Sequence, residues 1–393
     1  MIHQLLVSIK EPFLKLVPVS EPECIIGAGS VGKLADTCQR YNVTKPLIVT
    51  DQIIHKLGLL DSSFTSLSQA KIPYSLYDDV EQDPDYQTVR HGVEQYKSNQ
   101  CDGIVAFGGG SVIDCAKAIG ASVKTNKDIS RLPGLLKVLR RLMPIIAIPT
   151  TAGTGSECTV AAVVSDKEKQ IKQSITDPFL VPKVAIIDPA ITLGLPLQIT
   201  AETGIDALTH AIESYLSSYS NTYTQGLSIS AIKLIFKHMP NVFANGHDIV
   251  SREKMALASY QAGLAFTRTY IGYVHAIAHQ LGALYHVPHG RANAIVLTHV
   301  LRFYQERSNP KLLSMSKKLG FDSSESLIST IDELLEQIEI PKQLKELEDK
   351  DISKIATAAI KEAFGDYPVP EVMTTKDCER ILTKLLNTNT PTN

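Results

Sequence analysis

Residues 103–120 read GIVAFGGGSVIDCAKAIG and join a continuous apolar run to a glycine loop and then to a helical pattern. An apolar run without alternation is typical of a strand that is buried on both faces of a parallel sheet. The glycines at 108–110 let a ligand approach the backbone, and the helix that follows offers free N–H groups and the positive end of its dipole. This stretch predicts a strand–loop–helix unit of a doubly wound α/β fold with a phosphate site at the loop. The alternative is a strained turn at a sheet edge.

The same alternation of apolar runs and helical patterns extends to about residue 190. Further strands are expected at 46–50, 145–149, 161–165 and 184–187, and helices at 86–97 and 112–121. After Leu195 and Pro196 the 3.6-residue periodicity dominates, for example at 201–218, 225–238 and 252–265. We therefore predict an α/β dinucleotide-binding domain over residues 1–192 and an all-α domain over residues 193–393.

Composition limits the partners of this chain. Of 393 residues, 44% are hydrophobic and 20% charged, and 39 Lys+Arg nearly balance 41 Asp+Glu. Such a composition excludes a disordered chain, and the net charge of −2 provides no basic field for nucleic acid. Six cysteines without a C-x-x-C pair favour a reducing, cytoplasmic location. The sequence shows neither a signal peptide nor a membrane span, so the expected partner is a small molecule.

Besides residues 108–111, two other loops are candidates for contacts with a nucleotide. Residues 27–32 (GAGSVG) fit G-x-G-x-x-G, and Asp51 lies where a ribose-binding acid is expected. The alternative is a tight turn that begins a helix. Residues 149–157 (PTTAGTGSE) follow the apolar run at 145–149, and their hydroxyls suit hydrogen bonds to a ribose or a nicotinamide.

Histidines and one aspartate predict a metal site in the second half. Asp206 and His210 lie one helical turn apart and can chelate a cation, although such a pair is more often a surface hydrogen bond. His275 and His279 share one face of an otherwise apolar segment, where unsatisfied imidazoles are costly. Several imidazoles with one carboxylate suit Fe²⁺ or Zn²⁺. Spacing alone leaves the further ligands open among His275, His279, His286 and His289.

Four motifs in register resemble the iron-dependent (group III) alcohol dehydrogenase family. They are GGGSVIDCAKAI (108–119), IPTTAGTGSE (148–157), GIDALTHAIESY (204–215) and GYVHAIAHQLGALYHVPHGRANAI (272–295). The resemblance implies a dehydroquinate synthase-like architecture, with an α/β N-terminal dinucleotide-binding domain, an all-α C-terminal domain and the active site in the cleft between them. It implies an NAD-dependent, iron-containing alcohol dehydrogenase and a homodimer.

The resemblance also assigns roles to particular residues. The metal ligands would be Asp206, His210, His275 and His289, with His279 beside them as the catalytic group that faces substrate and nicotinamide. The cofactor-binding residues would be Asp51, Gly109, Gly110, Ser111, Thr150, Thr151, Thr154, Thr159, Val163 and Lys172. Asp51 would accept from the ribose 2′-OH and so favour NAD over NADP. Residues 27–32 would then be the turn before the first helix of the domain.

The expected reaction is hydride transfer between a primary or secondary alcohol, or its aldehyde or ketone, and NAD, with Fe²⁺ polarising the substrate oxygen. Zn²⁺ fits the same ligands. The alternative is a non-redox, metal- and NAD-dependent lyase similar to dehydroquinate synthase. Arg268 departs from the family pattern; it either recognises an acidic substrate or pairs with an acid elsewhere.

Overall fold

The computed structural model describes residues 2–16, 18–169 and 171–386, and this part of the chain divides into two compact units. The α/β unit comprises Pro18–Leu195 and His247–Gly263. The helical unit comprises Met1–Val17, Pro196–Gly246 and Leu264–Asn393. By their contacts, residues 2–16 cluster with the helical unit and residues 247–263 with the α/β unit, although residue 192 separates each segment from its unit in the sequence.

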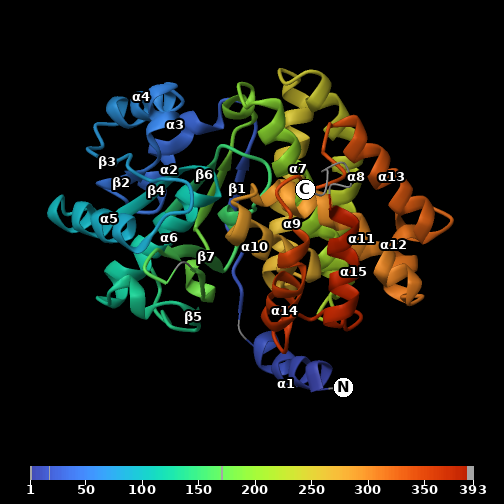
Figure 1. The fold of residues 1–393 in the computed structure, drawn as a ribbon. Helices are drawn as coiled ribbons and strands as arrows, with labels where there is room; N and C mark the ends of the chain where they lie inside the picture. The colour runs from blue at the N-terminus through green and yellow to red at the C-terminus, as the bar shows by residue number, and fades with distance from the viewer. Residues whose placement is uncertain (1, 17, 170, 387–393) are drawn as a thin grey trace. The chain divides into compact units, whose positions relative to one another are not determined.

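A parallel sheet forms the centre of the α/β unit (Figure 1), with six strands in the described residues ordered β1-β9-β6-β4-β2-β3. They are β1 (Glu23–Ile26), β2 (Pro46–Val49), β3 (Ser75–Tyr77), β4 (Gly103–Gly108), β6 (Ile145–Pro149) and β9 (Val184–Ile187). In β4, Ile104 and Ala106 belong to the core on one face, and Val105 and Phe107 belong to the core on the other. Burial on both faces explains the continuous apolar runs of the sequence.

Helices cover both faces of this sheet. They are α2 (Leu34–Arg40), α3 (Gln52–Lys56), α4 (Asp61–Gln69), α5 (Tyr86–Ser98) and α6 (Gly110–Thr125). Val89 of α5 and Ile113 of α6 lie in one core, whereas Leu34 of α2 and Leu67 of α4 lie in the other. The unit is therefore doubly wound, as predicted.

The apolar run at 161–165 forms a strand outside the central sheet. β7 (Ala161–Asp166) pairs antiparallel with β8 (Ile171–Thr176), which pairs in turn with β5 (Gly134–Leu135). Ala162 and Val164 of β7 are buried whereas Val163 between them is exposed. This one-sided burial is typical of an antiparallel strand.

The helical unit is built around α7, which is buried along most of its length. The helices of this unit are α1 (Ile2–Leu16), α7 (Leu197–Leu216), α8 (Thr222–Ala244), α10 (Tyr273–Tyr285), α11 (His289–Glu306), α12 (Pro310–Leu319), α13 (Ser324–Gln337), α14 (Ile352–Ala363) and α15 (Thr375–Leu385). Helix α7 packs against α8 and α11, and α10 packs against α11 and α14. Helix α7 is therefore enclosed by other helices, and its polar side chains Asp206, His210 and Glu213 are buried together with its apolar ones.

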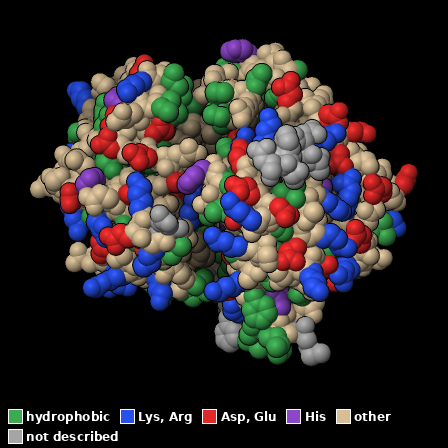
Figure 2. All heavy atoms as spheres, in the orientation of Figure 1, with side chains coloured by type: hydrophobic (Ala, Val, Ile, Leu, Met, Phe, Trp, Pro, Cys, Tyr) green, Lys and Arg blue, Asp and Glu red, His purple; other side chains and the backbone are tan. Residues whose placement is uncertain are grey.

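The N-terminal helix α1 explains why the first residues belong to the helical unit. His3 Nδ1 accepts from Gly365 N at 3.0 Å, and Lys10 Nζ donates to Gly365 O at 2.8 Å. The outer face of α1 carries the exposed apolar side chains that gather there in Figure 2, which are Ile2, Leu5, Leu6 and Ile9. No helix in the described residues has both the length and the apolar character that a membrane span requires.

Helix α9 (Ile249–Thr269) contributes to both units. Its earlier turns belong to the α/β unit, where Tyr260 donates from its hydroxyl to Pro22 O at 3.1 Å. There Gly155 and Gly263 approach so closely that a Cβ on Gly155 would lie 2.7 Å from Gly263 Cα. From Leu264 onward the helix belongs to the helical unit.

Candidate metal centre

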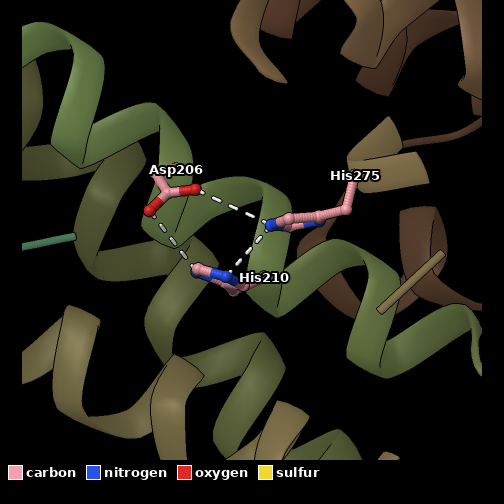
Figure 3. A group of neighbouring side chains, drawn as sticks. All are labelled: Asp206, His210 and His275. Atoms are coloured by element: carbon pink, nitrogen blue, oxygen red, sulfur yellow. Dashed lines mark hydrogen bonds and ion pairs between the residues drawn. The ribbon is translucent and has the colours of Figure 1, made fainter. Parts of the chain in front are cut away.

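The candidate ligands come from α7, α10 and the first residue of α11. Asp206 and His210 lie one turn apart on α7, and His275 lies on α10 (Figure 3). These three side chains form a buried group whose donor atoms all lie within 4.8 Å of one another. His289 begins α11 and joins them from the side of Asp206.

The distances in this group suit one small cation. His210 Nε2 lies 3.0 Å from His275 Nε2, which lies 3.7 Å from Asp206 Oδ1. Asp206 Oδ1 also lies 3.5 Å from His289 Nε2. Ligand atoms that share an ion at about 2.0–2.2 Å stand roughly 3–4 Å apart. The donor set of imidazoles and one carboxylate therefore fits Fe²⁺ or Zn²⁺.

The charges within the group keep the carboxylate ionised. Burial by itself would raise the pKa of Asp206, but the neighbouring His210 and His289 lower it well below its usual range. Burial would likewise lower the pKa of His275, yet Glu213 and Asp206 raise it to about 9. Burial lowers the pKa of His289, which favours its neutral, metal-binding form.

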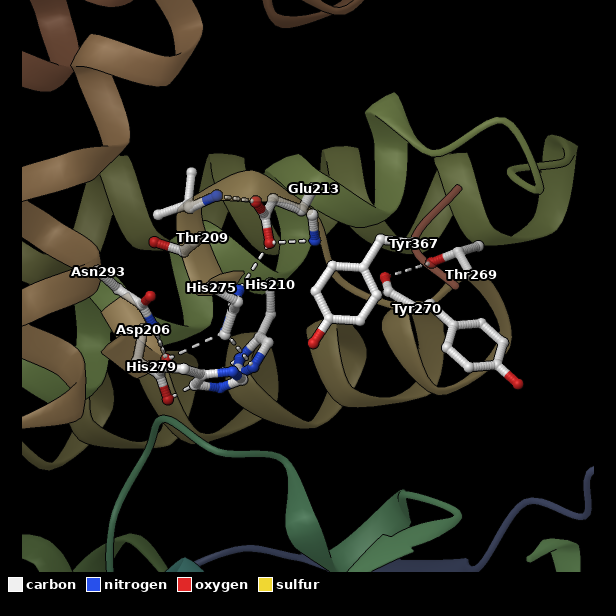
Figure 4. Close-up of polar contacts among 12 residues, drawn as sticks. Asp206, Thr209, His210, Glu213, Thr269, Tyr270, His275, His279, Asn293 and Tyr367 are labelled. Atoms are coloured by element: carbon white, nitrogen blue, oxygen red, sulfur yellow. Dashed lines mark hydrogen bonds and ion pairs between the residues drawn. The ribbon is translucent and has the colours of Figure 1, made fainter. Parts of the chain in front are cut away.

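Glu213 holds His275 from the side away from the group (Figure 4). Its Oε2 lies 2.6 Å from His275 Nδ1 and accepts from Gly272 N at 2.7 Å, while its Oε1 accepts from Val274 N at 2.7 Å. A carboxylate on Nδ1 fixes the proton there and leaves Nε2 free to bind a metal. Glu213 thus connects the start of α10 to α7 and orients one ligand.

Asn293 orients the carboxylate of Asp206. Its Nδ2 donates to Asp206 Oδ1 at 2.8 Å and lies 3.2 Å from His289 Nε2. The side chain is fully buried, and within the described residues its Oδ1 has no hydrogen-bond partner. Asn293 therefore steadies Asp206 and His289 together.

His279 lies beside this group rather than in it. Its Nδ1 is 2.6 Å from Glu362 Oε1, and its ring stacks on that of His289 with centroids 5.4 Å apart. His286 ends α10 in the left-handed conformation and is exposed. Of the histidines that spacing left open, His275 and His289 therefore lie nearest to Asp206.

The predicted phosphate loop and the threonine loop meet at the ends of β4 and β6. These strands pair up to Gly108 and Pro149, and Thr150 N donates to Gly108 O at 3.1 Å. A Cβ on Gly110 would lie 2.7 Å from Thr154 Cγ2, so the residue must be glycine for the loops to approach. Gly109 caps α6, Ser111 lies in its first turn, and a Cβ on Gly109 would contact Thr151.

Two other predicted cofactor residues, Asp51 and Lys172, lie outside these two loops. Asp51 follows β2 and caps α3, since its Oδ1 accepts from Ile53 N at 2.9 Å and Ile54 N at 2.8 Å. Lys172 on β8 forms an ion pair with Asp83 at 2.6 Å, and Asp83 N lies 3.4 Å from Ser111 Oγ. Residues 27–32 form the turn between β1 and α2, which is the place that the resemblance implied.

A buried lysine organises the end of the threonine loop. Within the described residues, Lys117 Nζ donates to Thr159 Oγ1 at 2.9 Å, Thr159 O at 3.0 Å, Ala161 O at 2.9 Å and Ser156 Oγ at 3.2 Å. Asp114, one turn earlier, accepts from Ser156 Oγ and from Val163 N. Thr159 and Val163 are therefore held by α6; their direct contact with a cofactor stays a prediction.

Arg268 is engaged within the helical unit. Its Nη1 donates to Leu264 O at 2.7 Å, and its guanidinium lies over the ring of Tyr223 at 5.6 Å. Phe266, two residues earlier, stacks on His210 at 4.1 Å. These contacts favour the interpretation that Arg268 is a structural residue.

Sequence reasoning assigned no role to several residues that hold the site. They are Lys117, Glu213, Asn293 and Glu362. Glu213 had a visible signal, because it shares a helix face with Asp206 and His210. Glu362 had none, since it lies far along the chain from His279.

Comparison with known proteins identifies the family. A model described as iron-containing alcohol dehydrogenase matches residues 21–189, and its C-terminal counterpart matches residues 200–386. The chain is 37% identical to 1,3-propanediol dehydrogenase of Klebsiella pneumoniae over 361 residues, which are 89% of this chain and 90% of that protein. It is 34% identical to the NAD-dependent methanol dehydrogenase of Bacillus methanolicus over 378 residues, which are 93% and 98% of the two chains.

Solved structures of related proteins support the same family. A 1,3-propanediol oxidoreductase superposes with a TM-score of 0.90 at 34% identity, covering 94% of this chain and 100% of that one. A sulfoacetaldehyde reductase from Bifidobacterium kashiwanohense in complex with NAD⁺ gives 0.87 at 28% identity, covering 95% and 100%. These relatives do not favour the lyase alternative. The chain belongs to the iron-containing alcohol dehydrogenase family and is an NAD-dependent oxidoreductase.

Proposed function

We propose that Asp206, His210, His275 and His289 hold Fe²⁺, or Zn²⁺ in its place, and that His279 exchanges a proton with the substrate. Three distances support this ligand set: 3.0 Å between the Nε2 atoms of His210 and His275, and 3.7 Å and 3.5 Å from Asp206 Oδ1 to Nε2 of His275 and of His289. When bound, the metal supplies Lewis-acid polarisation of the substrate oxygen, and NAD supplies hydride exchange at its nicotinamide.

The side chains of this unit prepare the site for that chemistry. Glu213 and Asn293 orient His275 and Asp206, so little reorganisation is needed when a cation enters. His279 stands beside the ligands with its Nδ1 committed to Glu362. It takes the hydroxyl proton during alcohol oxidation and returns one during aldehyde reduction, because the second ring nitrogen of an imidazole can accept and release a proton.

The NAD site is proposed along the edge where β2, β4 and β6 end. The pyrophosphate would rest on Gly109, Gly110 and Ser111, where the N-terminus of α6 offers free N–H groups. Thr150, Thr151 and Thr154 would line the nicotinamide side, and Thr159, Val163 and Lys172 would complete the site. Among the described residues, the capping bonds of Asp51 use only Oδ1, and Oδ2 would accept from a ribose hydroxyl.

The proposed substrate is a small primary or secondary alcohol or the corresponding carbonyl compound. The names of the relatives support this class, because they act on propanediol, methanol and sulfoacetaldehyde. We further propose a cytoplasmic homodimer. Free thiols at all six cysteines support the reducing location, and sedimentation analysis tests the dimer.

Two alanine variants test the ligand assignment. His275→Ala is expected to lose the metal, whereas His279→Ala keeps it and slows turnover about 10²- to 10⁴-fold, the range of general acid–base catalysis. Metal content and NADH absorbance with a panel of alcohols are the measurements. Equal metal loss in both variants contradicts the role of His279, and no net NADH with any alcohol contradicts the proposed reaction.

A further inference from the structure

The carboxylate of Glu362 is the centre of a hydrogen-bond network beside the candidate metal group. Among the described residues, its Oε1 lies 2.6 Å from His279 Nδ1 and accepts from the Tyr367 hydroxyl at 2.6 Å. Its Oε2 accepts from Gln280 Nε2 at 2.6 Å. Glu362 lies near the end of α14, which packs against α10, the helix of His279 and Gln280. Both carboxylate oxygens are therefore held in place.

This network determines which nitrogen of His279 carries its proton. Burial by itself would raise the pKa of Glu362, but the bonds from His279 and Tyr367 outweigh it and lower the pKa below its usual range. An ionised carboxylate only accepts hydrogen bonds, so Nδ1 must be the protonated nitrogen. In the neutral ring, Nε2 then keeps its lone pair and points away from Glu362.

The position of His279 suits a group that exchanges protons. Its ring stacks on His289 and lies edge-on to His275 with centroids 6.0 Å apart. Its side chain is 36% exposed, whereas that of His275 is 2% exposed. Within the described residues no hydrogen bond occupies Nε2, so its lone pair can accept a proton or a hydrogen bond.

We propose that Glu362 is a positioning residue that holds His279 in the Nδ1–H tautomer and directs Nε2 to the substrate. Tyr367 and Gln280 hold the carboxylate in turn. The inference rests on the proposed role of His279. It adds that this role depends on Glu362 of α14. Carboxylates that orient metal-ligating histidines contribute about 10- to 100-fold to metal affinity or activity, and we expect an effect of the same size for His279.

Glu362→Gln tests the proposal because it keeps the length of the side chain and removes its charge. The amide NH₂ faces either Gln280 or His279 together with Tyr367, so no carboxylate charge fixes the tautomer of His279 any longer. We expect kcat to fall about 10- to 100-fold, with the KM for NAD within about twofold and the metal content unchanged. Glu362→Asp should recover part of kcat because it restores the charge. Glu306→Gln, which alters an exposed glutamate paired with Arg380, is the matched control.

The double variant Glu362→Gln/His279→Ala separates this role from a general structural one. It should be no slower than His279→Ala alone, because Glu362 acts through that ring. In the Zn²⁺-loaded protein, ¹⁵N spectra of labelled histidine should show Nδ1–H at His279 in the wild type and a tautomer mixture in Glu362→Gln. Additive losses in the double variant, or an unchanged tautomer, overturn the proposal. If His279→Ala slows turnover and Glu362→Gln does not, only this inference fails; if His279→Ala has no effect, the proposed function of His279 fails.

Discussion

Replacing Glu213 by glutamine should weaken metal binding, because both oxygens of this carboxylate are used. Oε1 accepts from Val274 N, and Oε2 accepts from Gly272 N and faces His275 Nδ1, all at 2.6–2.7 Å. In either orientation the amide NH₂ of glutamine meets an N–H donor. One buried donor therefore loses its partner, which costs about 1–3 kcal/mol.

This free-energy cost should appear mainly as a lower affinity for the metal. Carboxylates that orient a ligating histidine contribute about 10- to 100-fold to affinity, or roughly 1.4–2.7 kcal/mol. Titration of the metal-free protein with Zn²⁺ against a chromophoric chelator measures this difference. Gly272→Ala tests the same contact without removing a polar group. Its Cβ would lie 2.7 Å from Glu213 Oε1 and displace the carboxylate, so the affinity for Zn²⁺ should fall here too.

The control is Glu336→Gln, which changes an exposed glutamate that pairs with Lys342. It should leave the affinity for Zn²⁺ unchanged. An affinity of Glu213→Gln within about twofold of the wild type would refute the reasoning, because it would mean that His275 keeps its orientation without the carboxylate.

Further predictions concern four other residues. Lys117→Met should lower the stability of the α/β unit by at least about 2 kcal/mol, because the buried acceptors that Lys117 serves lose their donor; thermal unfolding measures this loss, and an unchanged Tm contradicts it. Burial raises the pKa of Glu157 from 4.5 to about 7, so the native state binds this proton more tightly than the unfolded state. Its contribution to stability falls as the pH rises through this range, and Glu157→Gln should therefore raise Tm more at pH 8 than at pH 5, whereas an equal gain at both argues against it. Arg268→Ala should change the KM of acidic and neutral aldehydes alike, because its guanidinium donates to Leu264 O and lies over the Tyr223 ring; a selective loss for acidic aldehydes would assign it to the substrate. Asp51→Asn keeps a capping oxygen for α3 and removes the charge, so kcat/KM with NADP should rise relative to NAD, and an unchanged ratio counts against the ribose role.

Much of the α/β unit could be predicted because its signals are local. The strands expected at 103–107, 145–149 and 184–187 are found as β4, β6 and β9, since burial on both faces requires continuous apolar runs. The helices expected at 86–97 and 112–121 lie within α5 and α6. Short edge strands such as β1 and β3 escaped prediction because they bury fewer side chains and carry a weaker pattern.

Assignment to units was less predictable, because it depends on contacts between distant segments. Residues 1–17 read as the beginning of the α/β half, yet His3 and Lys10 hold Gly365. The run at 161–165 was expected to be a strand, but nothing local indicated that it would pair with β8 outside the central sheet.

The sequence by itself determined the order of an α/β half and a helical half, the glycine loop after β4 and the presence of metal-binding side chains one helical turn apart. These features depend on residues close together in the chain, where periodicity and spacing act directly. Only the tertiary structure decided which histidines approach Asp206, and that Glu213, Asn293 and Glu362 orient the side chains around them. The reason is that hydrogen bonds between residues of α7, α10, α11 and α14 meet there although their partners lie far apart in the sequence, 83 positions for His279 and Glu362 and 87 for Asp206 and Asn293. Helix packing, not local pattern, sets those distances.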